Sequence, residues 1–121
     1  LKERLWAEAR FAADPSIRQR PLARPVIVVG HMRSGTTRLH RLLAADERFA
    51  HLKLYEAMCP VPWPTSRPGR DPRIAYTQRG WRALNWVNPG NAAVHPTSAL
   101  EPDEELGVLE NSAWGAQIEA Q

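Results

Sequence analysis

The sequence predicts an α/β fold, and three consecutive segments carry this prediction. Residues 26–29 are an unbroken run of Val and Ile without polar alternation, which is typical of a strand buried on both faces of a parallel sheet. A turn bounded by Gly30 and Gly35 follows, and residues 36–45 then repeat leucines at helical spacing. Strand, glycine-bounded turn and helix in direct succession form the front half of a βαβ unit, whose crossover leads to a parallel neighbouring strand.

The other segments of the first half fit around this unit. Residues 1–13 place Leu and Ala three or four positions apart, which predicts a short amphipathic helix that ends before an Asp-Pro pair. Residues 18–25 are polar, contain two prolines and predict a linker. Residues 50–55 alternate apolar and polar side chains, so we expect the returning strand there, ending at Glu56.

The second half of the chain predicts a loop followed by helices. Residues 58–69 contain four prolines, which exclude a central strand or helix and predict a stiff surface loop. Asp-Pro at 71–72 is a good helix start, and apolar residues continue at helical spacing until Asn-Pro-Gly at 88–90. Residues 92–100 look irregular, and we expect a further helix from Glu101, because acids in a first turn suit the helix dipole.

The composition is that of an ordinary globular protein. Of the 121 residues, 43% are hydrophobic and 24% are charged, which excludes a disordered polyelectrolyte and a disulfide-rich scaffold. The single cysteine, Cys59, has no Cys/His ladder around it, so we predict no metal site. The longest apolar run, residues 26–29, is far shorter than the roughly 18 residues that cross a bilayer. With no basic-then-apolar leader visible, we predict a cytoplasmic protein without a membrane span.

The distribution of charge indicates where a partner binds. The net charge is +3, from 16 basic and 13 acidic residues. Basic residues are frequent from Arg18 to Arg48, whereas residues 101–121 carry six acids and no Lys or Arg. This asymmetry favours a localised anion site near the front of the chain. Nucleic acid is not an expected partner, because no basic stripe with interleaved aromatic residues recurs along the sequence.

The turn at residues 30–37 carries the chemistry. Its sequence, Gly-His-Met-Arg-Ser-Gly-Thr-Thr, has the glycine spacing of a phosphate-binding P-loop. Glycines let the backbone fold back, and the following helix points its first N–H groups and the positive end of its dipole at the same place, so an anion is expected there. The lysine of an ATP or GTP site is absent after the second glycine, and Arg33 supplies a cation inside the loop. This arrangement suits a compact anion bound without a metal.

Residues 25–43 resemble the 5′-phosphosulfate loop of the PAPS-dependent sulfotransferases, and most of all their bacterial branch. In that branch a hydrophobic strand runs into G-x-x-R-[ST]-G-T-T and a Leu-rich helix. The similarity continues from about Arg24 to Asn111, through Leu-Tyr-Glu at 54–56, a proline-rich Cys-Pro-Val-Pro-Trp-Pro loop at 59–64, Asp-Pro-Arg at 71–73, and His-Pro then Glu-Pro-Asp-Glu-Glu between 95 and 105.

The resemblance implies a fold and a reaction. The fold would be a P-loop-like three-layer α/β domain around a parallel sheet, of which residues 1–121 are the N-terminal portion. Residues 1–24 would be a leading helix and linker, and residues 25–121 the P-loop strand-helix unit with acceptor-side loops and helices. The reaction would move the sulfuryl group of PAPS (3′-phosphoadenylyl sulfate), without a metal, to a hydroxyl or amine of a small molecule, glycan or lipid.

The resemblance also assigns roles to the loop. Arg33 would contact the 5′-phosphate and the bridging oxygen, and so would take part in both cofactor binding and catalysis. The phosphosulfate would be held through backbone amides and hydroxyls of Ser34, Gly35, Thr36 and Thr37. The reaction has the logic of phosphoryl transfer, in which positioning and electrostatics do most of the catalysis.

Three residues compete as the base that takes the acceptor proton. Glu56 ends the expected second strand, at the edge where open α/β sheets bind ligands, and several sulfotransferase branches keep their glutamate base there. His95 comes second, since the cytosolic branch uses a histidine farther along the chain, and Glu104 comes third. Each also has a structural interpretation: Glu56 as the partner of an arginine, His95 as a loop residue before proline, and Glu104 as part of a dipole-matched helix start.

Two other functions stay open. A P-loop NTPase or nucleotide kinase would bind ATP with Mg²⁺, although neither the lysine nor a second acidic strand is evident. An inactive fragment would keep only the 5′-phosphosulfate loop, which would leave the isolated chain without activity. The family also binds the 3′-phosphate through an Arg and a Ser on later elements, and the Asp-Pro-Arg at 71–73 stands in the wrong context for that role.

Overall fold

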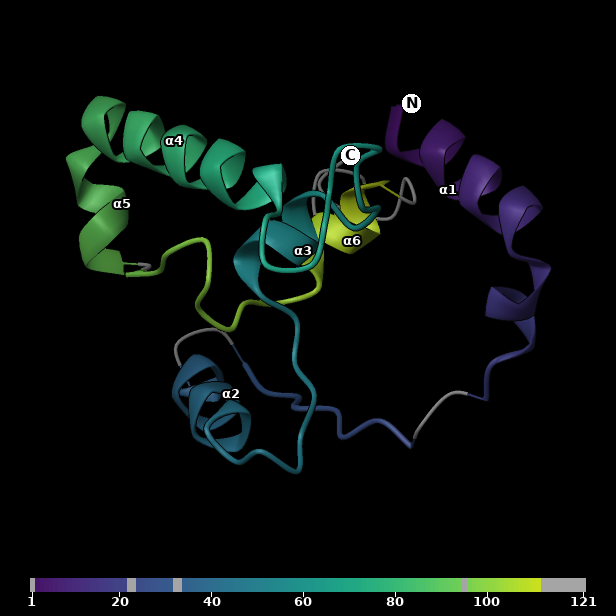
Figure 1. Ribbon diagram of the computed structural model, residues 1–121. Coiled ribbons are helices and arrows are strands. Elements are labelled where there is room, and N and C mark those ends of the chain that lie inside the picture. The colour runs from purple at the N-terminus through teal and green to yellow at the C-terminus, as the bar shows by residue number, and fades with distance from the viewer. Residues whose placement is uncertain (1, 22–23, 32–33, 95, 112–121) are drawn as a thin grey trace, which may run out of the picture. The chain divides into compact units, whose positions relative to one another are not determined.

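The computed structural model describes residues 2–21, 24–31, 34–94 and 96–111. Within these ranges the chain forms helices joined by irregular segments (Figure 1). In order they are α1 (Lys2–Ala13), the 3₁₀ helix η1 (Pro15–Gln19), α2 (Thr36–Ala44), α3 (Leu54–Met58), α4 (Pro72–Val87), α5 (Pro89–Val94) and α6 (Leu106–Asn111). The chain divides into an N-terminal unit, Leu1–Ala50, and a C-terminal unit, His51–Gln121, and each is described by itself.

The N-terminal unit consists of two helical segments joined by extended chain. The expected first helix is confirmed as α1, and Asp14 caps η1 by accepting a 3.1 Å hydrogen bond from the N–H of Ser16. Arg18 of η1 pairs with Glu8 of α1 at 3.1 Å. The expected helix after the glycine-bounded turn is confirmed as α2. None of the residues of α1, η1 and α2 is buried.

The expected strand at 25–29 is not a strand in the structure. This segment is extended, but Val26, Ile27 and Val29 are 61%, 75% and 87% exposed instead of buried. A strand exists only where its N–H and C=O groups pair with a neighbour, and the described residues offer this segment no ladder partner. The described part of the chain therefore shows no parallel sheet, and the sheet at the centre of the expected α/β fold is absent from it.

The expected strand at 50–55 is also wrong. Leu54–Met58 is the helix α3, and Lys53 makes only an isolated antiparallel bridge with Pro102. The reason is local: the carboxylate of Glu56, in the first turn, accepts a 3.0 Å hydrogen bond from the N–H of Lys53 and closes the helix start. Helical spacing also buries Leu54 and Ala57 on one side of α3.

Residues 99–103 run beside this segment, which corrects the helix expected from Glu101. The N–H groups of Leu54 and Tyr55 donate to the carbonyls of Glu101 and Ala99 at 3.1 and 3.2 Å, and the N–H of Asp103 donates to Leu52 at 3.0 Å. Backbone groups engaged in this pairing cannot also form helical hydrogen bonds. The helix α6 accordingly begins only at Leu106.

The helix expected from the Asp-Pro start is confirmed as α4, which is 16 residues long. Asp71 caps it by accepting from the N–H of Arg73, Pro72 takes the first turn, and Asn88 ends it. Residues 92–100 were expected to be irregular. Residues 92–94 instead belong to α5, because Pro89 can open a second helix as readily as it stops the first, whereas residues 96–100 are irregular as expected. In the described ranges no helix is long and apolar enough to span a membrane.

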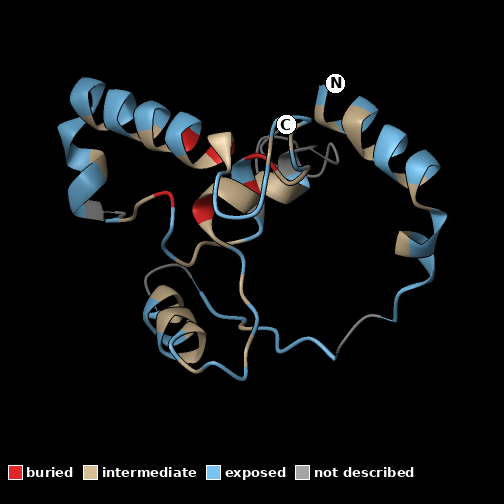
Figure 2. Ribbon diagram, viewed as in Figure 1, coloured by how far each residue is buried: buried red, intermediate tan, exposed pale blue. Residues whose placement is uncertain are grey.

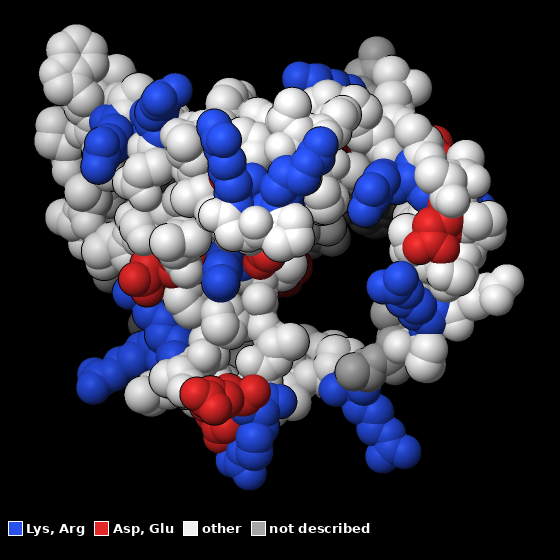
Figure 3. Space-filling view, viewed as in Figure 1, with Lys and Arg blue, Asp and Glu red and all other residues white. Residues whose placement is uncertain are grey.

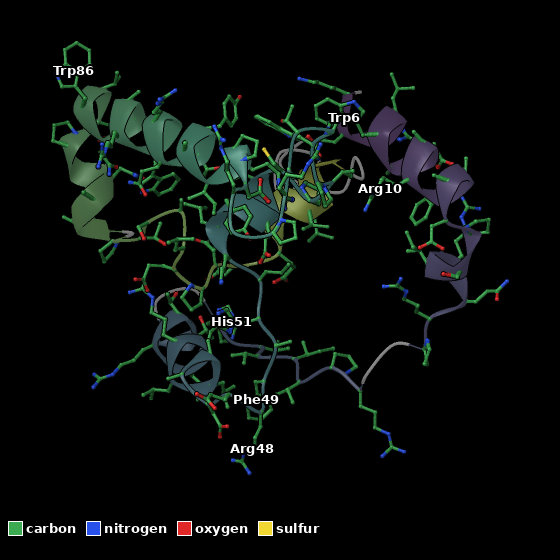
Figure 4. The ribbon with its side chains drawn as sticks, in the orientation of Figure 1. Trp6, Arg10, Arg48, Phe49, His51 and Trp86 are labelled. Carbon is green, nitrogen blue, oxygen red and sulfur yellow. The ribbon has the colours of Figure 1, made fainter. Side chains whose placement is uncertain are left out.

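The surface of α4 is basic and partly apolar. The helix carries arginines and no lysine or acid, and Figure 3 shows basic side chains at the upper left, where α4 lies, without acids among them. The side chain of Trp86 stands out from the end of the helix (Figure 4) and is largely exposed.

A small core lies in the C-terminal unit. The buried residues of the described ranges all belong to it: Leu54, Ala57, Cys59, Arg73, Thr77 and Ala99 (Figure 2). The helices α3 and α6 pack closely at Gly107, where a Cβ atom would lie 2.7 Å from the carbonyl oxygen of Ala57. Only glycine allows this approach of two backbones. The packed region therefore centres on α3, the helix that carries Glu56.

Candidate functional site: the glycine-bounded loop and Glu56

The glycine-bounded loop folds back on itself as expected. The N–H of Ser34 donates to the carbonyl of His31 at 3.2 Å and closes a turn. A Cβ atom at Gly30 would lie 2.7 Å from both the Ser34 hydroxyl oxygen and a Thr36 methyl group, so the entry and exit of the loop approach each other at this glycine. The extended chain thus turns sharply before α2 begins.

Gly35 sets the geometry of the helix start. Its φ of 90° and ψ of 12° lie in the left-handed region that side chains disfavour, and it occupies the N-cap position of α2. A glycine has no side chain to accept from the first N–H groups of the helix, and the first turn contains no acid. The backbone amides and the positive end of the helix dipole are thus directed toward the loop, an arrangement that binds anions.

The predicted loop residues are placed as follows. Ser34 is exposed, and Thr36 and Thr37 are half-buried in the first turn of α2. Arg33 lies outside the described residues, so its contact with the donor stays a prediction.

Comparison with known proteins assigns the chain to a family. The family model described as "Sulfotransferase family" matches residues 25–121, most of the chain and all of the loop. The chain belongs to the sulfotransferase family.

A solved sulfotransferase shares the structure. This sulfotransferase-family chain is similar to the crystal structure of sulfotransferase STF1 from Mycobacterium tuberculosis H37Rv, with a TM-score of 0.72 and 28% sequence identity. The match covers 98% of this chain and 33% of that one, so the chain spans one third of the length of the solved protein. No curated protein matches this sulfotransferase-family chain.

Glu56, the first candidate base, lies in α3 and not at a strand end. Its carboxylate accepts two hydrogen bonds, from the N–H of Lys53 to Oε2 and from the hydroxyl of Tyr55 to Oε1, each 3.0 Å long. The alternative expectation, that Glu56 pairs with an arginine, is therefore not what these two hydrogen bonds show: the donors are Lys53 N–H and the Tyr55 hydroxyl. Because each carboxylate oxygen has two lone pairs, both oxygens can still accept a further proton or hydrogen bond. The sequence signal for this helix start was the position of Glu56, three residues after Lys53, the N-cap of α3.

The other two candidates are placed differently. Glu104 belongs to the same unit as Glu56, follows the segment that pairs with residues 52–55, and is half-buried. Its N–H donates to Asp103 at 2.8 Å, so the acids from 101 to 105 are not the first turn of a helix. His95 lies outside the described residues and stays a prediction.

A buried ion pair supports the helix that carries Glu56. Nε and Nη2 of Arg73 bind both carboxylate oxygens of Asp71, at distances from 2.6 to 3.1 Å, and Nη1 donates to the carbonyl of Cys59 at 2.6 Å. The hydrogen bonds from Arg73 hold the pKa of Asp71 below its usual value despite partial burial. All three guanidinium nitrogens of Arg73 thus donate to groups of the fold itself.

Tyr55 connects this ion pair with Glu56 and was not singled out from the sequence. Its ring lies 5.1 Å from the guanidinium carbon of Arg73, within the range of a cation–π contact. Burial raises the pKa of the Tyr55 phenol, and the hydrogen bond to Glu56 raises it further. The described residues contain no group of three or more His, Cys, Asp or Glu side chains that could hold a metal ion.

Proposed function

We propose that this protein transfers the sulfuryl group of PAPS to a hydroxyl or amine of a small-molecule, glycan or lipid acceptor. The observation that carries the proposal is the loop of residues 30–37. This loop is bounded by glycines, forms a turn at the N-terminus of α2 and lacks the P-loop lysine. The chain that contains it belongs to the sulfotransferase family. The P-loop-like α/β architecture is part of the proposal. In such a fold residues 24–31, which lead into the loop and are neither helix nor turn here, would be the first strand of the sheet.

The donor would bind by its phosphosulfate end. The first amides of α2 and the hydroxyls of Ser34, Thr36 and Thr37 would bind the oxygens of the 5′-phosphosulfate, and Arg33 would neutralise the charge that collects on the bridging oxygen. Such preorganised donors act on charge that develops in the transition state.

The transfer step would use Glu56 as the base. The acceptor oxygen or nitrogen attacks sulfur and forms the new bond, while the bond from sulfur to the bridging oxygen breaks and PAP leaves with that electron pair. The acceptor proton passes to the Glu56 carboxylate. Proton transfer of this kind contributes about 10²- to 10⁴-fold to a rate.

Radiolabelled PAPS provides the test. With the label in the sulfuryl group, we expect it to pass to hydroxyl or amine acceptors in the presence of EDTA. Unlabelled PAP should compete with PAPS for binding far better than ATP with Mg²⁺ does. Tight ATP binding that depends on Mg²⁺, with weak PAP binding, would support a kinase or NTPase instead.

This chain matches only one third of the length of STF1, which favours a second candidate function: an inactive chain that retains the 5′-phosphosulfate loop. The same measurements identify it. PAP would bind in the absence of Mg²⁺, and no label would move to any acceptor.

A further inference from the structure

Tyr55 makes contacts that exceed what a packing residue needs. Its hydroxyl donates to Glu56, the proposed base, and its ring lies against the buried guanidinium of Arg73. We propose that Tyr55 is a positioning residue that holds the Glu56 carboxylate in the orientation from which it takes the acceptor proton. This inference rests on the proposed function, with Glu56 as the base.

The two hydrogen bonds of Glu56 fix its carboxylate group. The donor to Oε2 is the backbone N–H of Lys53, which cannot move without unwinding the start of α3. The donor to Oε1 is the Tyr55 hydroxyl, so the two oxygens are held by different groups and the carboxylate cannot rotate freely. Without the Tyr55 hydroxyl, only Oε2 of Glu56 keeps its hydrogen bond. A base that turns away from the acceptor loses the advantage of orientation, although it keeps its charge.

The hydroxyl itself is held by a chain of contacts from α4. Asp71 binds Arg73 through both carboxylate oxygens, and the carbonyl of Cys59 accepts from Nη1, so the guanidinium has one position. The Tyr55 ring lies 5.1 Å from it. A phenol of ordinary pKa is already protonated near neutral pH, and burial raises the pKa of Tyr55 further; the charged groups that act on it are Glu56, Arg73 and Asp71. A protonated phenol is a hydrogen-bond donor, as the positioning role requires.

Tyr55→Phe is the decisive variant, because it removes the hydroxyl and keeps the ring that lies on Arg73. We expect PAP affinity and the acceptor KM to stay within about twofold of wild type, while kcat for sulfuryl transfer falls about 10- to 100-fold. Tyr76→Phe is the matched control, since Tyr76 lies on α4 with an exposed ring beside Trp63, and it should transfer at the wild-type rate.

A double-mutant cycle separates positioning from a merely structural role. If Tyr55 acts through Glu56, then Tyr55→Phe costs no further activity once Glu56→Gln has removed the base. In a Tyr76→Phe background, where Tyr55 is the one remaining tyrosine, ultraviolet titration should give a Tyr55 pKa that falls when Glu56→Gln is introduced.

Several outcomes would overturn the inference. Full kcat in Tyr55→Phe, or an equal loss in the wild-type and Glu56→Gln backgrounds, would remove the positioning role and leave the proposed function intact. If the Glu56→Gln variant transfers the sulfuryl group at the wild-type rate, then Glu56 is not the base, and the inference fails. A wild-type protein that shows neither PAP binding nor transfer would overturn the proposed function itself, and this inference with it.

Discussion

Two arginines of this chain bind an aspartate two residues earlier with the same geometry. In Asp46–Arg48, Nε lies 3.0 and 3.1 Å from the two carboxylate oxygens and Nη2 lies 2.6 Å from Oδ2. In Asp71–Arg73 the same distances are 3.1, 3.0 and 2.6 Å. The side chains of Arg48 and Asp46 are 83% and 35% exposed, whereas those of Arg73 and Asp71 are 7% and 16% exposed. Figure 4 shows Arg48 directed away from the ribbon.

The comparison separates local chemistry from packing. Both Asp-x-Arg segments form the same pair, but an exposed pair contributes little to stability, because water and salt screen it. Burial changes the energetics, since removing one partner then leaves a charge without compensation. The two units differ in the same way. The N-terminal unit has the glycine-bounded loop and no buried residue in its helices, and the C-terminal unit has the core.

The largest expected effect breaks the buried pair. Arg73→Ala should lower the free energy of unfolding of the C-terminal unit by about 3–5 kcal/mol, because Asp71 and the Cys59 carbonyl lose their partner in a buried site. Urea unfolding followed by tryptophan fluorescence measures this change. The matched variant Arg48→Ala should leave the unfolding midpoint unchanged. Equal effects of the two substitutions would contradict the distinction between the pairs.

A smaller effect is expected where two backbones meet. Gly107→Ala should destabilise the C-terminal unit by roughly 1–3 kcal/mol, because its methyl group meets the backbone of Ala57 and α6 must shift away from α3. Gly80, inside α4, has no atom near its Cβ position, so Gly80→Ala should stabilise that helix by about 0.5–1 kcal/mol. Opposite shifts in the thermal midpoint are the expected result. A neutral Gly107→Ala would show that the two helices are not in backbone contact.

The three longest helices, α1, α2 and α4, could be predicted from the sequence, whereas α3 and α5 were missed and neither expected strand forms. The start and end of α4 follow from a capping aspartate, a proline at the first position and a closing Asn-Pro, all of which act within a few residues. A strand depends on a partner that local pattern does not reveal, so residues 25–29 and 50–55 were expected as strands but do not form them.

The same limit applies to the candidate site. The glycines of the loop act locally and were identified at the correct positions. The contact between Tyr55 and Arg73 joins residues that are distant in sequence, and the pairing of residues 52–55 with 99–103 is equally non-local. No pattern of spacing within either segment predicts these contacts. For Glu56 the sequence predicted a strand end, whereas the residue lies in α3.

A third prediction compares Gly35 and Gly69, the glycines with positive φ angles in the described part of the chain. Neither has an atom near its Cβ position, so an alanine costs only backbone strain, about 1–2 kcal/mol. Gly69→Ala should lower the stability of the C-terminal unit by this amount. Gly35→Ala should instead weaken PAP binding about tenfold, because the strain falls on the turn that we propose binds the phosphosulfate. Calorimetry with PAP on both variants checks this, and weaker binding in Gly69→Ala alone would contradict it.

The smallest expected effect is that of pH. The folded state holds the pKa of Asp71 below its ordinary value of 3.8, mainly through the hydrogen bonds from Arg73, so the unfolded chain binds the proton more readily. The stability from this group is therefore complete above about pH 4 and is lost as the pH falls through the lowered pKa. Asp71→Asn, which keeps a capping side chain, should flatten the acid limb of the stability profile. An unchanged acid limb would show that the pair contributes nothing to this dependence.

The central claim is that the loop of residues 30–37 binds the phosphosulfate end of PAPS through Arg33 and the start of α2. Calorimetric titration with PAP in the presence of EDTA tests it most directly, on the wild type, Arg33→Ala and, as control, Arg24→Ala outside the loop. We expect wild type and Arg24→Ala to bind alike and Arg33→Ala to bind about 10- to 100-fold more weakly, the effect of losing a charged hydrogen-bond donor. No binding of PAP by the wild type, or equal binding by Arg33→Ala, would contradict the account.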